Sequence, residues 1–172
     1  MEELLKNKNE ESFQKRNFSR KDKDDKELKF SVAIYPKKER IQLLDGGDKE
    51  IGYLLFSTDS KDLEKLRVQD MRITNPKEYG NNLAIELYEE LLTFVKQNKL
   101  KGIKSDDVVY FGAVAVWKKL SDKGYSLIVN PDAQNEYNNF CEKYNKGEEY
   151  ITEDKRLSAK KGASVFEINI TL

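Results

Sequence analysis

A change of hydrophobic period near residue 83 is the sequence feature that most restricts the fold of this chain. Before it, Leu66, Val68, Met71 and Ile73 form a short apolar run of the kind seen in strands. The run stops at Thr74-Asn75-Pro76, where asparagine and proline favour a turn. From Leu83 onwards, apolar residues recur at intervals of three and four, which predicts an amphipathic helix over 81–98.

The loop between this strand and this helix is a candidate anion site. The first-turn N–H groups of a helix lack helical partners and the helix dipole is positive there, so a loop that leads into a helix can hold a phosphate. Gly80 would let the main chain approach such a group closely, and Asn81 or Asn82 would cap the helix. An ordinary strand-to-helix turn uses the same residues, so both interpretations stay open.

The remaining segments predict an α+β fold, with a mixed, mostly antiparallel sheet flanked by helices. Asp45-Gly46-Gly47-Asp48 separates two apolar runs and predicts a hairpin, because glycine permits positive φ. The predicted strands are 28–35, 40–44, 50–57, the run before residue 74, a short strand near Ile103, 125–129 and 164–172. Ser105-Asp106-Asp107 is predicted to cap a second helix over 113–120, Asn130-Pro131-Asp132 to begin a third, and 145–162 to form a loop.

Charge and length indicate one domain with a polar N-terminal extension. Residues 1–26 are nearly all polar, with charges of both signs, so we expect a flexible charged segment there and a single domain over 27–172. The basic run over 15–23 includes Asp22 and has acidic residues on both sides, which favours a solvated tail over a nucleic-acid-binding arm. No long apolar run and no hydrophobic signal segment is found, which predicts a cytoplasmic protein that does not enter the membrane.

The composition also excludes several chemistries. The chain contains no histidine, which rules out Ser–His–Asp and Cys–His pairs and histidine-based zinc sites. The single cysteine, Cys141, can form neither an intramolecular disulfide nor a thiolate cluster. No metal site is predicted, and any catalysis would use carboxylate, lysine, tyrosine, serine or main-chain groups.

The order of these elements over residues 28 to 172 resembles the GNAT-type N-acyltransferase fold. In that family the loop after the fourth strand follows Gln/Arg-x-x-Gly-x-Gly/Ala, and its amides bind the pyrophosphate of coenzyme A. In one alignment the motif falls on residues 75–80 (Asn-Pro-Lys-Glu-Tyr-Gly), and only its last glycine matches, at Gly80. In a shifted alignment its three defined positions fall on Lys77, Gly80 and Asn82, and only its first glycine matches. The resemblance therefore implies acetyl-CoA, or another acyl-CoA, as cofactor. The residues that it implies for binding are the main chain of Met71 and Ile73 beside the pantetheine arm, and Asn75, Lys77, Gly80, Asn81 and Asn82 around the pyrophosphate.

A second family signature, Asn-x-x-Ala-x-x-Leu-Tyr followed by Gly-Phe, falls on residues 110–117 and on Gly124-Tyr125. The tyrosine that often serves as general acid falls on Trp117, and an indole N–H cannot deliver a proton in that way. The hydroxyl of Tyr110 would replace that tyrosine as the acid. Asp70 lies where the family often places the base that deprotonates the amine. The stretch LKGIKSDDVVYFGAVAVWKKLSDKGY is also similar to GNAT-like domains carried by phages and mobile elements.

The resemblance implies an acyl-CoA-dependent N-acyltransferase, in which an amine attacks the thioester directly. The acyl acceptor would be an amine-bearing small molecule or protein, and the sequence leaves open its identity and whether the chain forms a homodimer. The alternative is a catalytically inactive GNAT-like binding or accessory protein of a phage or mobile element, because the loop motif is degenerate and the tyrosine is replaced.

Overall fold

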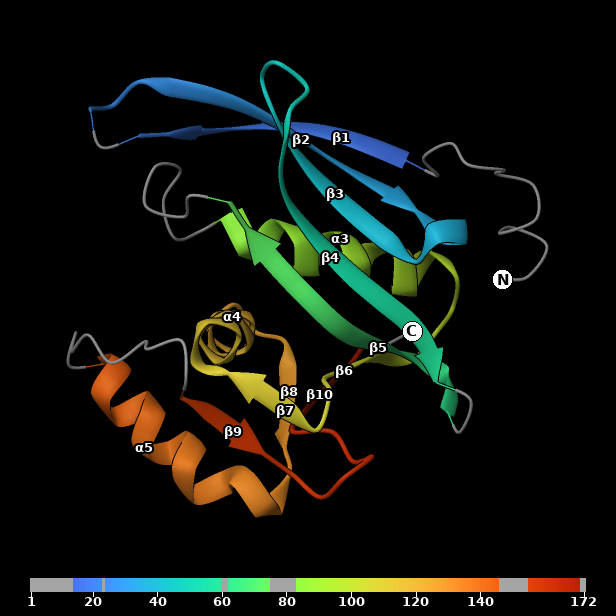
Figure 1. Cartoon of the computed structure of the whole chain (residues 1–172), viewed down its shortest axis with the longest axis vertical. Coiled ribbons are helices and arrows are strands. Elements are labelled where there is room, and N and C mark those ends of the chain that lie inside the picture. The colour runs from blue at the N-terminus through green and yellow to red at the C-terminus, as the bar shows by residue number, and fades with distance from the viewer. Residues whose placement is uncertain (1–13, 23, 60–61, 75–82, 146–154, 171–172) are drawn as a thin grey trace. The chain divides into compact units, whose positions relative to one another are not determined.

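The computed structural model describes residues 14–22, 24–59, 62–74, 83–145 and 155–170 (Figure 1). They form two compact units. The first comprises the described residues up to Ser57 together with the described part of Gln69–Asn98, and the second comprises Thr58–Val68 with the described residues from Lys99 onwards. One long strand, β5 (Asp62–Ile73), contributes its first half to the second unit and its second half to the first.

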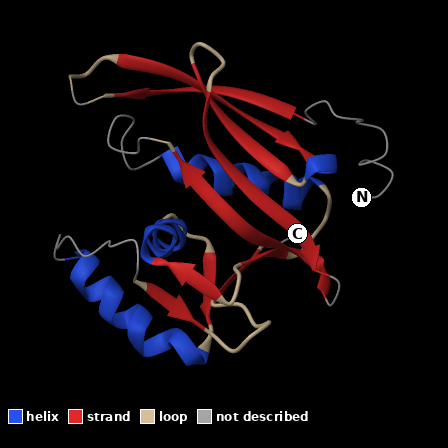
Figure 2. Cartoon of the chain, viewed as in Figure 1, coloured by secondary structure: helices blue, strands red, loops and turns tan. Residues whose placement is uncertain are grey.

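The first unit is an antiparallel sheet with one helix on it. Its strands follow the order β1-β2-β3-β4-β5, and a single 3₁₀ turn, Pro36–Lys38, joins β2 to β3. The bounds are β1 Gln14–Lys21, β2 Glu27–Tyr35, β3 Arg40–Asp45, β4 Glu50–Asp59 and α3 Leu83–Gln97. Helix α3 packs on β2 and β3 (Figure 2). Successive side chains of a strand point to opposite faces, and Val32, Ile34 and Leu43, which share one face, are fully buried.

The second unit pairs the first half of β5 in parallel with β6 (Gly102–Lys104) and continues through β10 (Phe166–Asn169) to β8 (Ser126–Val129), both antiparallel. A separate two-stranded sheet joins β7 (Val108–Tyr110) to β9 (Arg156–Ser158). The helices are α4 (Phe111–Asp122) and α5 (Gln134–Asn145), the latter preceded by a 3₁₀ turn at Pro131–Ala133. Trp117 of α4 stacks on Phe166 of β10 with 5.5 Å between ring centroids, and this pair lies in the core of the unit.

The predicted α+β architecture is confirmed, with a mostly antiparallel sheet and three α-helices among the described residues. The change of period near residue 83 marks the start of α3, and Asn130 caps the turn before α5 by accepting a hydrogen bond from the N–H of Asp132.

Three local expectations differ from the structure. Within the segment 1–26, which was expected to be flexible, residues 14–21 form strand β1, paired with β2 along its whole length. The Ser105-Asp106-Asp107 cluster does not cap a helix: β7 follows it, and α4 begins at Phe111 without a side-chain cap. The Ser105 hydroxyl instead accepts a hydrogen bond from the N–H of Phe166. Within the expected loop 145–162, residues 156–158 form β9, because their main chain pairs with β7.

Candidate functional site

Asp70 lies half-buried on the second half of β5, and both of its carboxylate oxygens accept hydrogen bonds. The Tyr53 hydroxyl on neighbouring β4 donates to Oδ2 at 3.1 Å, and the main-chain N–H of Met71 donates to Oδ1 at 2.9 Å. Two donors that approach from different directions fix the plane of the carboxylate. The sequence proposes Asp70 as a base, and that role stays a prediction. It does not point to Tyr53, because the contact between the two depends on the β4–β5 register and no motif marks it.

Tyr53 is itself held in place. The guanidinium of Arg40 lies over the Tyr53 ring at 4.6 Å from its centroid, and Arg40 also forms an ion pair with Glu50. Burial and the hydrogen bond to Asp70 raise the pKa of Tyr53 above its ordinary value of 10.0, and the charges of Arg72 and Arg40 offset part of this rise. The phenol is therefore protonated at neutral pH and acts as a donor.

The main-chain groups of Met71 and Ile73 face the edge of β5 that lies away from β4. The N–H of Thr74 donates to the Ile51 carbonyl at 2.7 Å, and the Arg72 carbonyl approaches Gly52, so these two residues direct their main-chain groups toward β4. Successive residues of a strand direct theirs to opposite edges, which leaves those of Met71 and Ile73 on the other one. The pairing of β5 with β6 covers Lys65–Arg67, so β5 continues from Val68 to Ile73 beyond it.

The rest of the predicted cofactor site lies outside the described residues. This applies to Asn75, Lys77, Gly80, Asn81 and Asn82, which lie between β5 and α3 in the sequence. The described part of the chain resumes at Leu83, the first residue of α3.

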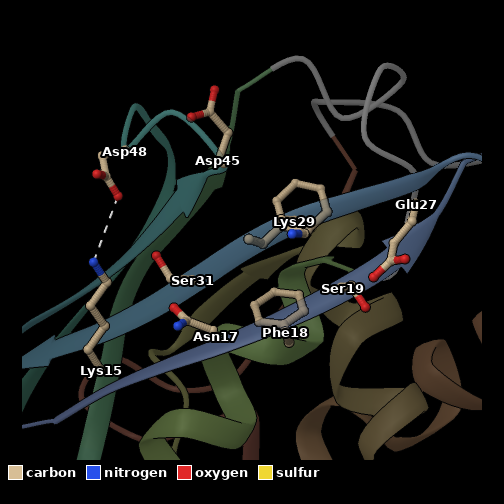
Figure 3. Close-up of a pocket in the computed structure, with 11 residues that line it drawn as sticks. Lys15, Asn17, Phe18, Ser19, Glu27, Lys29, Ser31, Asp45 and Asp48 are labelled. Carbon is tan, nitrogen blue, oxygen red and sulfur yellow. Dashed lines mark ion pairs between the residues drawn. The ribbon is translucent and has the colours of Figure 1, made fainter.

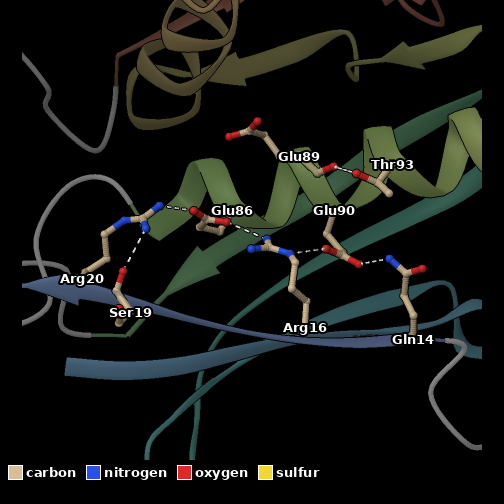
Figure 4. A network of polar contacts seen from close by, with 8 residues as sticks. All are labelled: Gln14, Arg16, Ser19, Arg20, Glu86, Glu89, Glu90 and Thr93. Atoms are coloured by element: carbon tan, nitrogen blue, oxygen red, sulfur yellow. Dashed lines mark hydrogen bonds and ion pairs between the residues drawn. The ribbon is translucent and has the colours of Figure 1, made fainter. Parts of the chain in front are cut away.

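A network of charged side chains joins β1 to the first half of α3 (Figure 4). Arg16 places Nη2 at 2.7 Å from Glu86 and Nε at 3.3 Å from Glu90, while Arg20 pairs with Glu86 and Gln14 with Glu90. Glu90 is only 1% exposed. Burial acts to lower the pKa of Arg16, but the hydrogen bonds and charges of the two glutamates outweigh it, so the pKa is raised. Both arginines of β1 are thus engaged within the unit.

Tyr110, the predicted acid, lies at the end of β7 in the second unit, immediately before α4, and its side chain is 49% exposed. Asp70 belongs to the first unit. Trp117, at the position of the family's tyrosine, is 1% exposed and its ring is packed against Phe166. Its role in the described fold is therefore that of a core residue.

A hollow of about 470 Å³ lies over β1, β2 and the β3–β4 turn (Figure 3). Lys15 and Asp48 form an ion pair at 3.7 Å beside it, and Ser31, only 5% exposed, is part of its lining. Lys15 and Asn17 alternate along β1 with Arg16, which turns toward α3, so the hollow opens on the other face of the sheet. None of the predicted site residues lines it.

The described residues contain no group of three or more His, Cys, Asp or Glu side chains placed to hold a metal ion. None of the helices that the structure describes is long and apolar enough to cross a membrane.

No protein-family model matches the sequence, and a comparison with curated proteins found no match. Solved structures with a similar course of the chain include a nourseothricin acetyltransferase, at 11% identity and a TM-score of 0.46, with 97% of this chain and 91% of that chain covered. Another is the diaminobutyrate acetyltransferase of Paenibacillus lautus in complex with L-2,4-diaminobutyric acid and coenzyme A. Its identity is 10% and its TM-score 0.43, with 79% of this chain and 72% of that chain covered. At these identities and TM-scores, the likeness assigns neither a family nor an activity to this chain.

Proposed function

We propose that this chain is an N-acyltransferase of the GNAT type, which transfers an acyl group from an acyl-coenzyme A to an amine. The observation that carries the proposal is the second half of β5. Its outer edge presents the main chain of Met71 and Ile73 beyond the β6 pairing, and it carries a half-buried carboxylate at Asp70. The next helix along the sequence is α3.

The described residues fit an acyl-CoA at this edge. Met71 and Ile73 would hydrogen-bond the amide groups of the pantetheine arm through their main chain, as a neighbouring strand would. Residues 75–82 would hold the pyrophosphate with the N-terminus of α3. The acidic residue in the first turn of α3, Glu86, is neutralised by Arg16 and Arg20 and so does not repel an anion bound there. When bound, the cofactor supplies an activated acyl thioester.

Asp70 is the residue for which we propose the catalytic role. It would accept a proton from the attacking amine, directly or through water, while Tyr53 keeps the carboxylate oriented. Tyr110, an exposed residue of the second unit, is proposed as the acid for the leaving thiolate. Turnover does not depend on such an acid, because holding amine and thioester together and stabilising charge with main-chain amides lowers the barrier by itself.

The test is amine-dependent release of the coenzyme A thiol from acetyl-CoA, measured with a panel containing spermidine, L-lysine and a lysine-bearing peptide. We expect release above the protein-free rate with at least one amine, reduced at least about tenfold in D70N. The control is D48N, which removes a carboxylate that lies away from β5 and contacts Lys15. Rates equal to the protein-free control with every amine would contradict the proposal.

A second candidate function is a binding protein of the same fold that has no activity. The replacement of the family's tyrosine by Trp117, which is packed in the core, favours it, because that position then supplies no proton to the leaving thiolate. This candidate predicts that acetyl-CoA is bound without turnover, or is not bound, and the same panel together with a calorimetric titration separates it from the enzyme.

A further inference from the structure

We infer that the Asp70 carboxylate and the acyl-CoA compete for one donor, the N–H of Met71, so that binding of the cofactor releases a carboxylate oxygen for the acceptor amine. This inference deepens the proposed function and rests on it. It makes Asp70 a residue with two arrangements, one that caps the edge of the strand and one that serves the amine.

The competition follows from the direction of a single bond. The N–H of Met71 faces the edge of β5 where the cofactor is proposed to pair, and it already donates to Asp70 Oδ1 at 2.9 Å. One N–H makes one well-aligned hydrogen bond, so a carbonyl of the pantetheine arm can pair with Met71 only after Oδ1 has moved away.

The carboxylate has a second anchor that survives this exchange. Tyr53 donates to Oδ2 at 3.1 Å, and the Tyr53 ring is covered by Arg40, which is paired with Glu50. When the Met71 hydrogen bond is lost, the carboxylate can therefore rotate while its Oδ2 stays hydrogen-bonded to Tyr53.

The released oxygen, Asp70 Oδ1, is suited to bind the ammonium group of the acceptor. Oδ1 loses its N–H donor, and the described contacts of Asp70 contain no second donor for that oxygen. A carboxylate oxygen without a donor pairs most strongly with a cation, and the acceptor amine arrives as an ammonium group. The amine is therefore bound best when the cofactor is already in place.

Calorimetric titration with acetyl-CoA tests the competition. Removal of the competing carboxylate in D70A should tighten acetyl-CoA binding by about tenfold, the factor expected for loss of one charge-assisted hydrogen bond from the free protein. D70N retains an acceptor oxygen at the same position and should bind more weakly than D70A.

Because coenzyme A is an anion, removal of any carboxylate could strengthen binding without a specific contact. D48A provides the matched control, since it removes one negative charge from the same unit at a site that contacts Lys15. D48A should keep the wild-type affinity within about twofold at 0.15 M salt, where exposed charges are largely screened. Equal tightening in D48A and D70A would overturn the inference.

A second readout needs no ligand. In the unliganded protein the Met71 amide should exchange with deuterium more slowly than in D70A, by about tenfold or more, because its acceptor is lost in the variant. The amide of Thr74, which donates to Ile51, should be unchanged and reports that β5 is intact. Equal Met71 exchange in the two proteins would overturn the inference.

Acetyl-CoA binding by wild type and D70A distinguishes failure of the competition from failure of the proposed function. If wild type binds acetyl-CoA and D70A binds no more tightly, the competition is wrong and the proposed function stands. If neither protein binds acetyl-CoA at millimolar concentration, the proposed function is wrong and the competition falls with it.

Discussion

Tyr53 is the residue on which the geometry of Asp70 depends. Its hydroxyl is a donor only while protonated, and burial together with the Asp70 carboxylate keeps the phenolate unfavourable. The charge of Asp70 on β5 therefore affects the pKa of Tyr53 on β4, and this effect can be measured.

In D70N the pKa of Tyr53 should fall toward its ordinary value of 10.0, because the negative charge that opposes the phenolate is gone. The folded-state pKa of wild-type Tyr53 lies above the unfolded value. Its contribution to stability is therefore complete below about pH 10 and is lost as the pH rises through the folded-state pKa. Absorbance of the phenolate at alkaline pH, compared among wild type, D70N and Y53F, measures the shift. The same titration curve for Tyr53 in wild type and D70N would contradict the assignment.

The sequence proposes Asp70 as a base, which stays a prediction, and does not point to its partner Tyr53. Asp70 was predicted from the resemblance alone, whereas Tyr53 requires knowledge of how β4 and β5 align. A hint exists at Gly52, where a Cβ would lie 2.7 Å from Ile73 Cδ1, so a glycine within a strand marks a close approach to β5. The predicted phosphate-binding residues 75–82 lie outside the described residues and stay predictions.

Among the elements, β1 and α3 depend on each other through buried charges. Glu90 is almost fully buried and draws its partners from Arg16 and Gln14 on β1. R16M should lower the free energy of unfolding by about 1–3 kcal/mol, less than for a fully buried pair because the Arg16 side chain remains 43% exposed.

K15M is the matched control for R16M, because Lys15 is adjacent on β1 but makes a 3.7 Å ion pair with the exposed Asp48 on the other face. We expect a change within about 0.5 kcal/mol for K15M in urea unfolding. If R16M and K15M unfold at the same urea concentration, the network does not stabilise the unit.

The pairing of β6 with β10 requires a glycine. A Cβ at Gly102 would overlap the carbonyl oxygen of Ile168, so G102A should cost about 3 kcal/mol or more. At Gly112, in the first turn of α4, a Cβ would meet no other part of the described chain within 4 Å, so G112A should be neutral or stabilising by up to about 1 kcal/mol. Thermal unfolding of the two variants measures both effects, and similar midpoints would contradict the β6–β10 register.

The elements that sequence patterns missed are those whose partners are far along the chain. The residues of β1 look like a solvated tail because nearly all of them are polar and acidic residues flank them on both sides. Arg16 and Arg20 nevertheless pair with glutamates some 70 residues away. β9 is three residues long and exists through its pairing with β7. Long periodic segments such as α3 were predicted correctly, because their apolar spacing is set locally.

For the molecule as a whole, a bound cofactor should stabilise the folded state by mass action. At 100 times the dissociation constant, acetyl-CoA should raise the free energy of unfolding by about 2.7 kcal/mol. In a chain of 172 residues this corresponds to a rise in midpoint of roughly 5–10 °C. Thermal unfolding followed by circular dichroism gives the shift, with ADP as the control for the nucleotide portion alone. A midpoint that is unchanged at millimolar acetyl-CoA would contradict binding.

If the outer edge of β5 binds an acyl-CoA, amide-resolved NMR titration with acetyl-CoA should give saturable shifts at the amides of Met71 and Ile73. The amides of β1 should be unchanged. Absence of any saturable shift at millimolar acetyl-CoA, or shifts confined to residues away from β5 and α3, would contradict binding at this edge.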